Sequence, residues 1–229
     1  MKNKIQTTLL GFVAFILTAC NSQDCDKSNW SPLFNNDLTN ASYNKEVWSL
    51  DDKGVLTANK DEIIFTNKEY ENFELELEFR LEHESNSGVV IYCTDSKNWV
   101  PNSIEIQIAD SSSTRFGKPY WNCGCIFGHV DSEFDTRLPL GQWHKMKIRA
   151  VGQNIDVWLN GKHVSKMNMA EWTDNLKTPN GVKIPRWLTL HKKCDMPTKG
   201  KIGLQGKHGN AATDYRNVKI RSINSCSAK

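Results

Sequence analysis

Apolar and polar residues alternate with a period of two along much of the chain, which indicates β-strands with one buried face. The clearest case is FELELEFRL at 73–81, where the apolar side chains share one face and the glutamates and the arginine share the other. Such alternation is typical of a half-buried antiparallel strand. We therefore expect a sheet with one face on a core and one face in water.

Further short stretches with the same period follow, separated by turn residues. Asn160-Gly161 predicts a type I′ hairpin turn, because both residues tolerate positive φ. Only residues 168–177, NMAEWTDNLK, suggest a helix. Short strands with little helix predict an all-β sandwich of two antiparallel sheets. The further predicted strands are 88–93, 103–110, 143–151, 155–164, 201–206 and 216–223.

The stretch SIEIQIAD at 103–110 places a carboxylate beside a carboxamide on one strand face. Its three isoleucines share the opposite face, so they are expected between the two sheets. Glu105 and Gln107 then point out of the sandwich, ~7 Å apart along the strand. On a flat or convex sheet they would be solvated, whereas on a concave sheet they would line a groove.

The N-terminus predicts export and a lipid anchor. Residues 1–19 combine two lysines, an apolar run that is too short to span a bilayer, and small residues before Cys20. This order resembles the lipobox of bacterial lipoproteins, so we expect cleavage before Cys20, lipidation of its thiol and a short tether over 20–29. The expected location is the bacterial cell envelope, with one domain over 30–225. An ordinary signal peptide that happens to end at a cysteine is the alternative.

The charge balance limits the expected partners, and the cysteine spacing limits the expected metal sites. The chain has 29 Lys and Arg against 26 Asp and Glu, and loss of Lys2 and Lys4 with the leader brings the net charge near +1. This balance gives no reason to expect nucleic acid as a partner. Six cysteines besides Cys20 remain, and Cys25 with Cys226 could join the chain ends. The CGC at 123–125 lacks the spacing of a zinc site, so structural disulfides or buried thiols are favoured.

Several separated motifs resemble one bacterial family, the 3-keto-disaccharide hydrolases. They are NSGVVIY, IEIQIAD, GQWHKMKIRAVGQNIDVWLNGKHV and GKIGLQGKHGNAATDYRNVKI, and they occur in the family's order over about residues 30–223. The resemblance implies a concanavalin A-like jelly roll in which the concave face of the larger sheet is the sugar site. Two departures stand out: Tyr92 occupies a position where members often have Arg, and the segment before His208 is one residue longer.

A conventional glucanase on this fold is disfavoured. Retaining concanavalin-like glucanases carry Glu-x-Asp-x-(x)-Glu on one strand, and they need two carboxyl groups ~5–5.5 Å apart. Here Glu105 is present, but Gln107 and then Ala109 and Asp110 stand at the other positions. Asp110 has the opposite parity to Glu105 in a regular strand, so it faces away unless a bulge turns it.

Cleavage of a 3-keto-glycoside, which the resemblance implies, needs less. The ketone acidifies the hydrogen on carbon 2, so one base and a stabiliser for the enolate oxygen suffice. Glu105 or His208 is the candidate base, with Gln107, Gln205 and Arg216 as candidate donors to substrate. A divalent metal is an alternative Lewis acid, with Glu105, Asp110 and His208 as candidate ligands, although their spacing shows no site.

Each remaining candidate has a structural alternative. Trp158 is a candidate sugar-stacking residue, and Tyr92 and Trp121 are candidate substrate contacts. Trp99 and Trp121 could wall the groove, but tryptophans often only pack in a sandwich. Arg216 could form a structural ion pair. Asp110 could cap the turn that follows it, and His208 could be an exposed loop residue.

Three functions therefore stay open for the sequence. The resemblance favours an enzyme that cleaves 3-keto-glycosides or 3-keto-disaccharides by proton abstraction and elimination or hydrolysis. The first alternative is a non-catalytic carbohydrate-binding lipoprotein, since the fold does not fix the function. The second is a conventional β-glucanase. In each case we expect an oligosaccharide or glycoside partner, and contact with a membrane through the lipid anchor alone.

Overall fold

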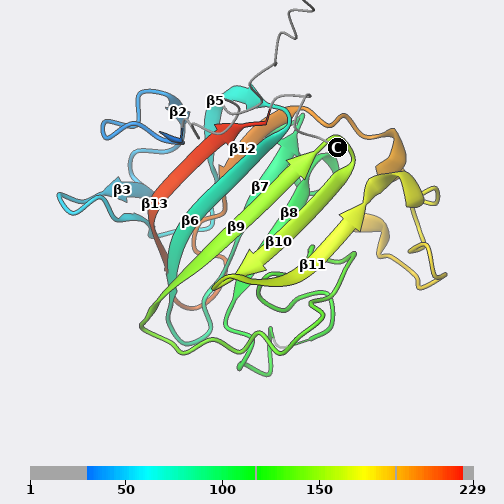
Figure 1. Ribbon diagram of the computed structural model, residues 1–229. Coiled ribbons are helices and arrows are strands. Elements are labelled where there is room, and N and C mark those ends of the chain that lie inside the picture. The colour runs from blue at the N-terminus through cyan, green and yellow to red at the C-terminus, as the bar shows by residue number, and fades with distance from the viewer. Residues whose placement is uncertain (1–29, 117, 189, 224–229) are drawn as a thin grey trace, which may run out of the picture.

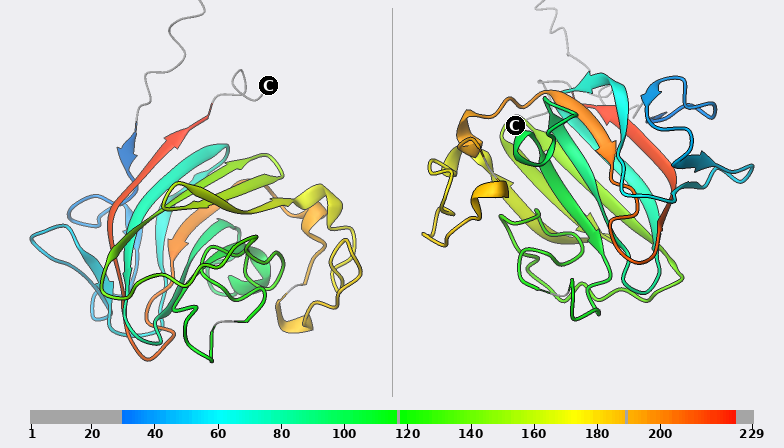
Figure 2. Two further views of the ribbon diagram at one scale, coloured as in Figure 1. Left: turned by 60° about the horizontal axis from the view of Figure 1, so that its bottom comes forward. Right: turned by 180° about the vertical axis from the view of Figure 1, so that it is seen from behind.

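The chain folds into two antiparallel β-sheets packed face to face, in a computed structural model that describes residues 30–223 apart from 117 and 189 (Figures 1 and 2). Cys20, Cys25, Cys226 and the predicted leader and tether lie outside the described residues. The predicted jelly-roll β-sandwich is confirmed. In the described part of the chain, no helix is both long and apolar enough to span a bilayer.

The larger sheet has eight strands, and its strand order is β11-β10-β9-β6-β13-β4-β3, with β1 also paired to β13. The long central strands are those that the period-two pattern predicts. The strands of this sheet are β1 (Ser31–Pro32), β3 (Trp48–Leu50), β4 (Leu56–Ala58), β6 (Phe73–Leu81), β9 (Trp143–Val151), β10 (Asn154–Leu159), β11 (Lys162–Asn168) and β13 (Thr213–Ser222).

The smaller sheet has five strands in the order β2-β5-β12-β7-β8. The right view of Figure 2, in which the molecule is seen from behind, shows the outer face of this sheet. The strands are β2 (Ala41–Ser42), β5 (Ile64–Tyr70), β7 (Asn86–Cys93), β8 (Ile104–Ala109) and β12 (Gly200–Leu204). Four short 3-10 turns complete the described elements: η1 (Val100–Asn102), η2 (Met169–Glu171), η3 (Arg186–Leu188) and η4 (Lys193–Asp195).

The core lies between the sheets, as the alternation predicts. Ile104, Ile106 and Ile108 of β8 are at most 1% exposed and pack in one cluster with the inward side chains of β6. Full burial of each such side chain contributes about 1.5–3 kcal/mol to folding. The isoleucine face of β8 therefore fixes which way Glu105 and Gln107 point, namely out of the sandwich.

Two local predictions have different outcomes. The hairpin turn between β10 and β11 is confirmed, because Asn160 and Gly161 both have positive φ, at 48° and 84°. The helix predicted over 168–177 is wrong, since only η2 forms, capped by the side chain of Asn168. Trp172 ends this turn as a buried residue, so tertiary packing outweighs the weak helical pattern.

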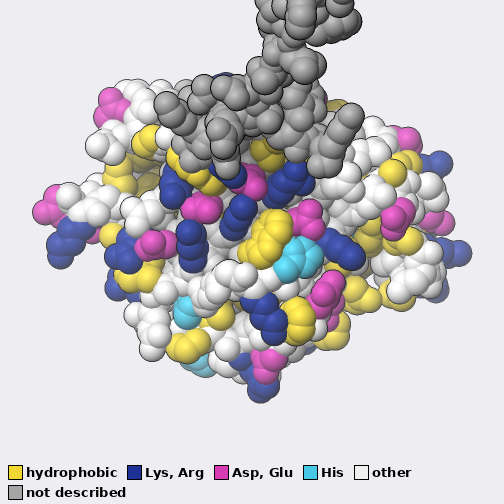
Figure 3. Space-filling model, viewed as in Figure 1, with side chains coloured by type: hydrophobic (Ala, Val, Ile, Leu, Met, Phe, Trp, Pro, Cys, Tyr) yellow, Lys and Arg dark blue, Asp and Glu magenta, His cyan; other side chains and the backbone are white. Residues whose placement is uncertain are grey.

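The outer face of the eight-stranded sheet is a ladder of ion pairs. Glu74 contacts Lys147 at 2.9 Å, Glu76 contacts Lys145 at 3.1 Å, and further basic residues on β13 face the same glutamates. Figure 3 shows this face, where Lys and Arg alternate with Asp and Glu. Partly exposed pairs of this kind add little stability individually, but they occupy the charged groups of this face.

The described cysteines are all free thiols, so the structure favours buried thiols over disulfides for this part of the chain. Cys93, Cys123 and Cys125 are buried, and Cys194 is partly exposed. Burial raises the pKa of the Cys93 thiol to about 11 and that of Cys123 to about 12. These thiols stay protonated at neutral pH and act as small apolar core residues.

Candidate functional site

A pocket of about 620 Å³ lies on the outer face of the five-stranded sheet. The strand with Glu105 belongs to the smaller sheet, whereas the resemblance implied a sugar site on the concave face of the larger sheet. The pocket is within the size range of sites for small organic ligands. Its lining includes Tyr43, Asp61, Asn86, Trp99, Val100, Glu105, Gln107, Trp121, Phe127, Gln205 and His208.

Glu105 lies at the floor of this pocket as a buried carboxylate. The residue is 9% exposed, and among the described residues none makes a hydrogen bond to its carboxyl group. Burial is the main reason that its pKa rises from the ordinary value to about 8; nearby Asp61 raises it further, and His208 lowers it. A carboxyl group in this environment exchanges its proton near neutral pH, as a general acid or base must.

Gly88 on the neighbouring strand makes room for this carboxylate. A methyl group at Gly88 would overlap a carboxylate oxygen of Glu105. The two residues come from the paired strands β7 and β8, where Gly88 lies opposite Gln107 and Val90 opposite Glu105. Glycine inside a strand often marks the close approach of another group, and here that group is the side chain of Glu105.

We expect Gly88→Ala to destabilise the protein through Glu105. The added methyl group should cost about 1–3 kcal/mol in the free energy of unfolding, because the carboxylate has to move. In a Glu105→Ala background the same substitution should cost much less. Urea unfolding of the four proteins measures this coupling; equal costs in both backgrounds would contradict the packing assignment.

His208 and Asp61 form a hydrogen-bonded pair at the pocket wall. Nδ1 of His208 lies 2.6 Å from Oδ2 of Asp61, and both side chains are about half exposed. The hydrogen bond to Asp61 raises the pKa of His208, and burial opposes this in part. Because Nδ1 faces the carboxylate, Nε2 is the ring nitrogen that remains for a substrate.

Gly206 lets the segment before His208, which is one residue longer than in the family pattern, pack closely enough to place His208 in the pocket. A Cβ at Gly206 would collide with the carbonyl oxygens of Lys60 and Glu62, so only glycine allows this close approach. The backbone N–H of His208 then donates to the carbonyl of Asn86 at 3.1 Å. The extra residue is thus accommodated with His208 facing the same pocket as Glu105.

Gln107 and Gln205 line the pocket, but Gln107 does not present a free donor. Its Nε2 donates to Oδ1 of Asn86 at 2.5 Å and to the carbonyl of Ser87 at 3.1 Å. The amide hydrogens of Gln107 are therefore used within the protein, and they hold Asn86 at the pocket wall. Gln205 is 7% exposed, and its Nε2 lies 3.5 Å from Asp61, at the limit of a hydrogen bond.

Sequence reasoning missed Asp61, Asn86 and Phe127. Asp61 lies in a loop 147 residues before His208, with no motif around it. Asn86 could have been noticed as the first residue of the NSGVVIY motif. Phe127 is placed by backbone pairing, because its N–H donates to the carbonyl of Glu105 at 2.9 Å.

Tyr92 does not reach the pocket. It is fully buried in the core, and its hydroxyl donates to the carbonyl of Gly152 at 2.9 Å. Tyr92 has a positive φ of 55°, a break in the regular strand that turns its side chain between the sheets. The sequence interpretation of Tyr92 as a substrate contact in this pocket is therefore wrong.

Trp158 and Arg216 lie on the other sheet and likewise do not line this pocket. Trp158 on β10 packs edge-on to His163, with Lys147 over its ring. Nε of Arg216 lies 2.6 Å from Glu78, and its guanidinium stacks on Trp143. The structural ion pair that the sequence allowed for Arg216 is thus present, and the tryptophans that line the pocket are Trp99 and Trp121.

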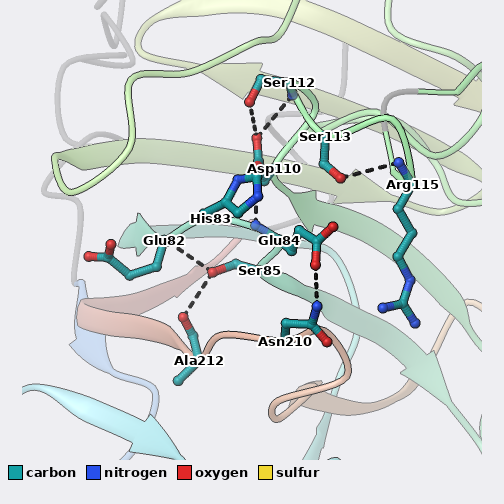
Figure 4. A network of polar contacts seen from close by, with 10 residues as sticks. All are labelled: Glu82, His83, Glu84, Ser85, Asp110, Ser112, Ser113, Arg115, Asn210 and Ala212. Carbon is teal, nitrogen blue, oxygen red and sulfur yellow. Dashed lines mark hydrogen bonds and ion pairs between the residues drawn. The ribbon is translucent and has the colours of Figure 1, made fainter.

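Asp110 caps local turns, as Figure 4 shows. Its buried carboxylate accepts hydrogen bonds from the backbone N–H groups of Glu84 and Ser112, both at 3.0 Å, and contacts His83 at 3.3 Å. Although burial opposes it, hydrogen bonds from Ser112 and Glu84 lower the pKa of Asp110. Asp110 does not line the pocket. Over the residues that the structure describes, no three His, Cys, Asp or Glu side chains are grouped as metal ligands.

Aromatic side chains form the walls beside Glu105. Trp99 and Trp121 both line the pocket, as the sequence interpretation proposed for them. Trp121 packs edge-on against Phe127, with ring centroids 5.2 Å apart. A carboxylic acid floor, a His–Asp pair and aromatic walls are a combination suited to holding and protonating or deprotonating a sugar.

The protonation of Glu105 should also appear in the stability of the protein. Its native pKa of about 8 lies above the ordinary 4.5, so the native state binds this proton more tightly than the unfolded chain. The resulting stabilisation is complete below pH 4.5 and is lost as the pH rises to 8, by roughly 4 kcal/mol. Glu105→Gln should remove this dependence. Urea unfolding at pH 5 and pH 8.5 tests this, and identical pH dependence in the two proteins would refute it.

The chain has the fold of a carbohydrate-active β-sandwich protein. More specifically, the chain matches the 3-keto-alpha-glucoside-1,2-lyase-like domain family over residues 29–221, and it belongs to this family. The resemblance inferred from the sequence motifs is thus confirmed.

Solved structures agree with this assignment. A candidate glycosyl hydrolase from Parabacteroides distasonis ATCC 8503 is 53% identical, with a TM-score of 0.81, over 85% of this chain and 99% of that chain. A second candidate glycosyl hydrolase from the same organism is 22% identical, with a TM-score of 0.66, over 85% and 94% of the two chains. A Bacillus subtilis protein with a galectin-like fold is 12% identical, with a TM-score of 0.53, over 84% and 94%, and shares the fold. No curated protein matches the chain.

Proposed function

We propose that this protein cleaves 3-keto-glycosides by removing the proton on carbon 2 and eliminating the group on carbon 1. The observation that carries the proposal is the buried Glu105 carboxyl, which has a pKa of about 8 and no hydrogen bond to another described residue. His208 and Asp61 are the charged residues that affect this pKa, His208 by lowering it and Asp61 by raising it. Family membership supports the choice of a keto sugar, since a 1,2-lyase acts across carbons 1 and 2.

The proposed elimination uses Glu105 as base and His208 as acid. Ionised Glu105 takes the proton from carbon 2, whose acidity comes from the ketone on carbon 3. The electron pair forms the double bond between carbons 1 and 2, the bond from carbon 1 to the glycosidic oxygen breaks, and that oxygen takes a proton from Nε2 of His208. Asp61 keeps His208 protonated through Nδ1.

Addition of water restores both residues. Neutral His208 takes a proton from water as the oxygen adds to carbon 1, and protonated Glu105 returns its proton to carbon 2. The net reaction is hydrolysis of the keto-glycoside, and an unsaturated keto sugar is its intermediate. The amide of Asn86, positioned by Gln107, is the proposed donor to the oxygen on carbon 3 during both steps.

A comparison of substrates tests the proposal. The protein without residues 1–20 is incubated with methyl 3-keto-glucoside and with methyl glucoside in deuterated water. We expect methanol release from the keto compound alone, with deuterium incorporated at carbon 2 of the product. Release from methyl glucoside alone would indicate a conventional glycosidase, and binding without any release would indicate a carbohydrate-binding protein; either result would overturn the proposal.

We further propose that the protein acts at the bacterial cell envelope, tethered through a lipid on Cys20. The sequence of the leader supports this proposal. Cys20 and its surroundings lie outside the residues that the structure describes. Cys20→Ala should prevent incorporation of labelled fatty acid and release the protein from the membrane fraction. Unchanged labelling would overturn the anchor.

A further inference from the structure

A row of aromatic side chains leads from the pocket to the protein surface. Trp121 and Phe127 line the pocket, and Phe127 also packs against Trp187 with ring centroids 6.2 Å apart. Trp187 is outside the pocket lining and is 59% exposed. The row therefore begins beside Glu105 and ends in solvent.

Trp187 is held in place from two sides. Its turn, η3, contacts η1, whose first residue Val100 lines the pocket. The next residue, Leu188, is buried against Gly128, where a methyl group would collide with the leucine side chain. The exposed ring is thus fixed beside Phe127 by a buried anchor one residue away.

Exposed large apolar side chains are concentrated in the segment 182–190, which carries Trp187. Four large hydrophobic side chains are exposed in the described residues, and three of them are Val182, Trp187 and Leu190. Scattered surface apolar residues need no explanation, but a tryptophan that continues the wall of a pocket suggests a ligand contact. The volume of about 620 Å³ also leaves space beyond a single sugar ring.

We propose that Trp121, Phe127 and Trp187 form the subsite for the leaving group, which rests on the proposed function. The ligand chemistry is a ring with a flat apolar face, attached through the glycosidic oxygen that departs. A pyranose and an aromatic aglycone both have such a face, and both stack on tryptophan. The keto sugar lies over Glu105, and the second ring extends toward Trp187.

Substrates that differ only in the leaving group test this subsite. The unaltered protein and Trp187→Ala are compared on a 3-keto-disaccharide, phenyl 3-keto-glucoside and methyl 3-keto-glucoside. Loss of one ring contact should lower kcat/KM about 3- to 10-fold for a substrate with a second ring. The methyl glycoside should be cleaved at the same rate by both proteins, because it does not reach Trp187.

Two further variants sharpen the test. Trp187→Phe should recover most of the loss, because an aromatic face remains. Phe134→Ala removes another exposed aromatic residue, which is 43% exposed and does not line the pocket, and should change none of the rates. A loss confined to the disaccharide assigns the subsite to a sugar, and a loss confined to the phenyl compound assigns it to an aromatic group.

The failures of the two proposals are distinguishable. An equal loss on all three substrates, or no loss on any, would overturn the leaving-group subsite while cleavage itself continues. If the unaltered protein cleaves none of the three, the proposed function fails. The subsite is then judged by calorimetric binding of the 3-keto-disaccharide and the phenyl compound, which Trp187→Ala should weaken; unchanged binding of both would overturn it.

Discussion

Glu105→Gln is expected to lower kcat/KM for methyl 3-keto-glucoside by about 10²–10⁴-fold, the usual contribution of a general base. The carboxamide has nearly the same shape as the carboxylate, but it cannot take the proton from carbon 2. The fold should persist, because a neutral side chain avoids the cost of burying a charge. Initial rates of methanol release, with circular dichroism to confirm folding, measure the effect.

Glu78→Gln is the matched control for this substitution. Glu78 is also a strand glutamate, but it lies on the outer face of the other sheet and pairs with Arg216. Its replacement should leave kcat/KM within about two-fold of the unaltered protein, since a surface pair contributes little. A Glu105→Gln protein that keeps the full rate would exclude Glu105 as the base.

His208→Gln is expected to lower kcat/KM for the same substrate by about 10²-fold, because the leaving oxygen then departs without a proton. Asp61→Asn should have a smaller effect with a distinct signature. Since the hydrogen bond to Asp61 raises the pKa of His208, its loss should shift the alkaline side of the pH–rate profile to lower pH. Rates measured from pH 5 to 10 show both effects.

The chain provides another His–Asp pair as a control. His163 and Asp156 are 2.9 Å apart on the eight-stranded sheet, away from the pocket. His163→Gln should leave both the rate and the pH profile unchanged. A pH profile that is the same in Asp61→Asn as in the unaltered protein would remove Asp61 from the proposed mechanism.

Side-chain parity explains what the sequence could predict about the fold. The alternation in 73–81 and 103–110 correctly assigns the inward and outward faces of β6 and β8, because the period of a strand is two. The two- and three-residue strands at the N-terminal end are too short to show a period. Those strands could therefore be found only from the folded chain.

Parity alone could not choose between the two outer faces. Glu105, Trp158 and Arg216 all point out of the sandwich. Glu105 lies on the outer face of the five-stranded sheet, and Trp158 and Arg216 lie on the outer face of the eight-stranded sheet. Strand order decides this, and it depends on contacts between distant segments. The pairing of Asp61 with His208 is of the same kind, since it joins residues 147 positions apart.

The segment that carries Phe127 also closes the open edge of β8. The N–H of Gln107 donates to the carbonyl of Cys125 at 3.0 Å, and the N–H of Gly124 returns a bond to Gln107 at 2.8 Å. An uncovered apolar strand edge is a template for aggregation. A change in the backbone of this segment that moves the pocket wall would therefore also uncover the edge of β8, which links the shape of the pocket to the solubility of the protein.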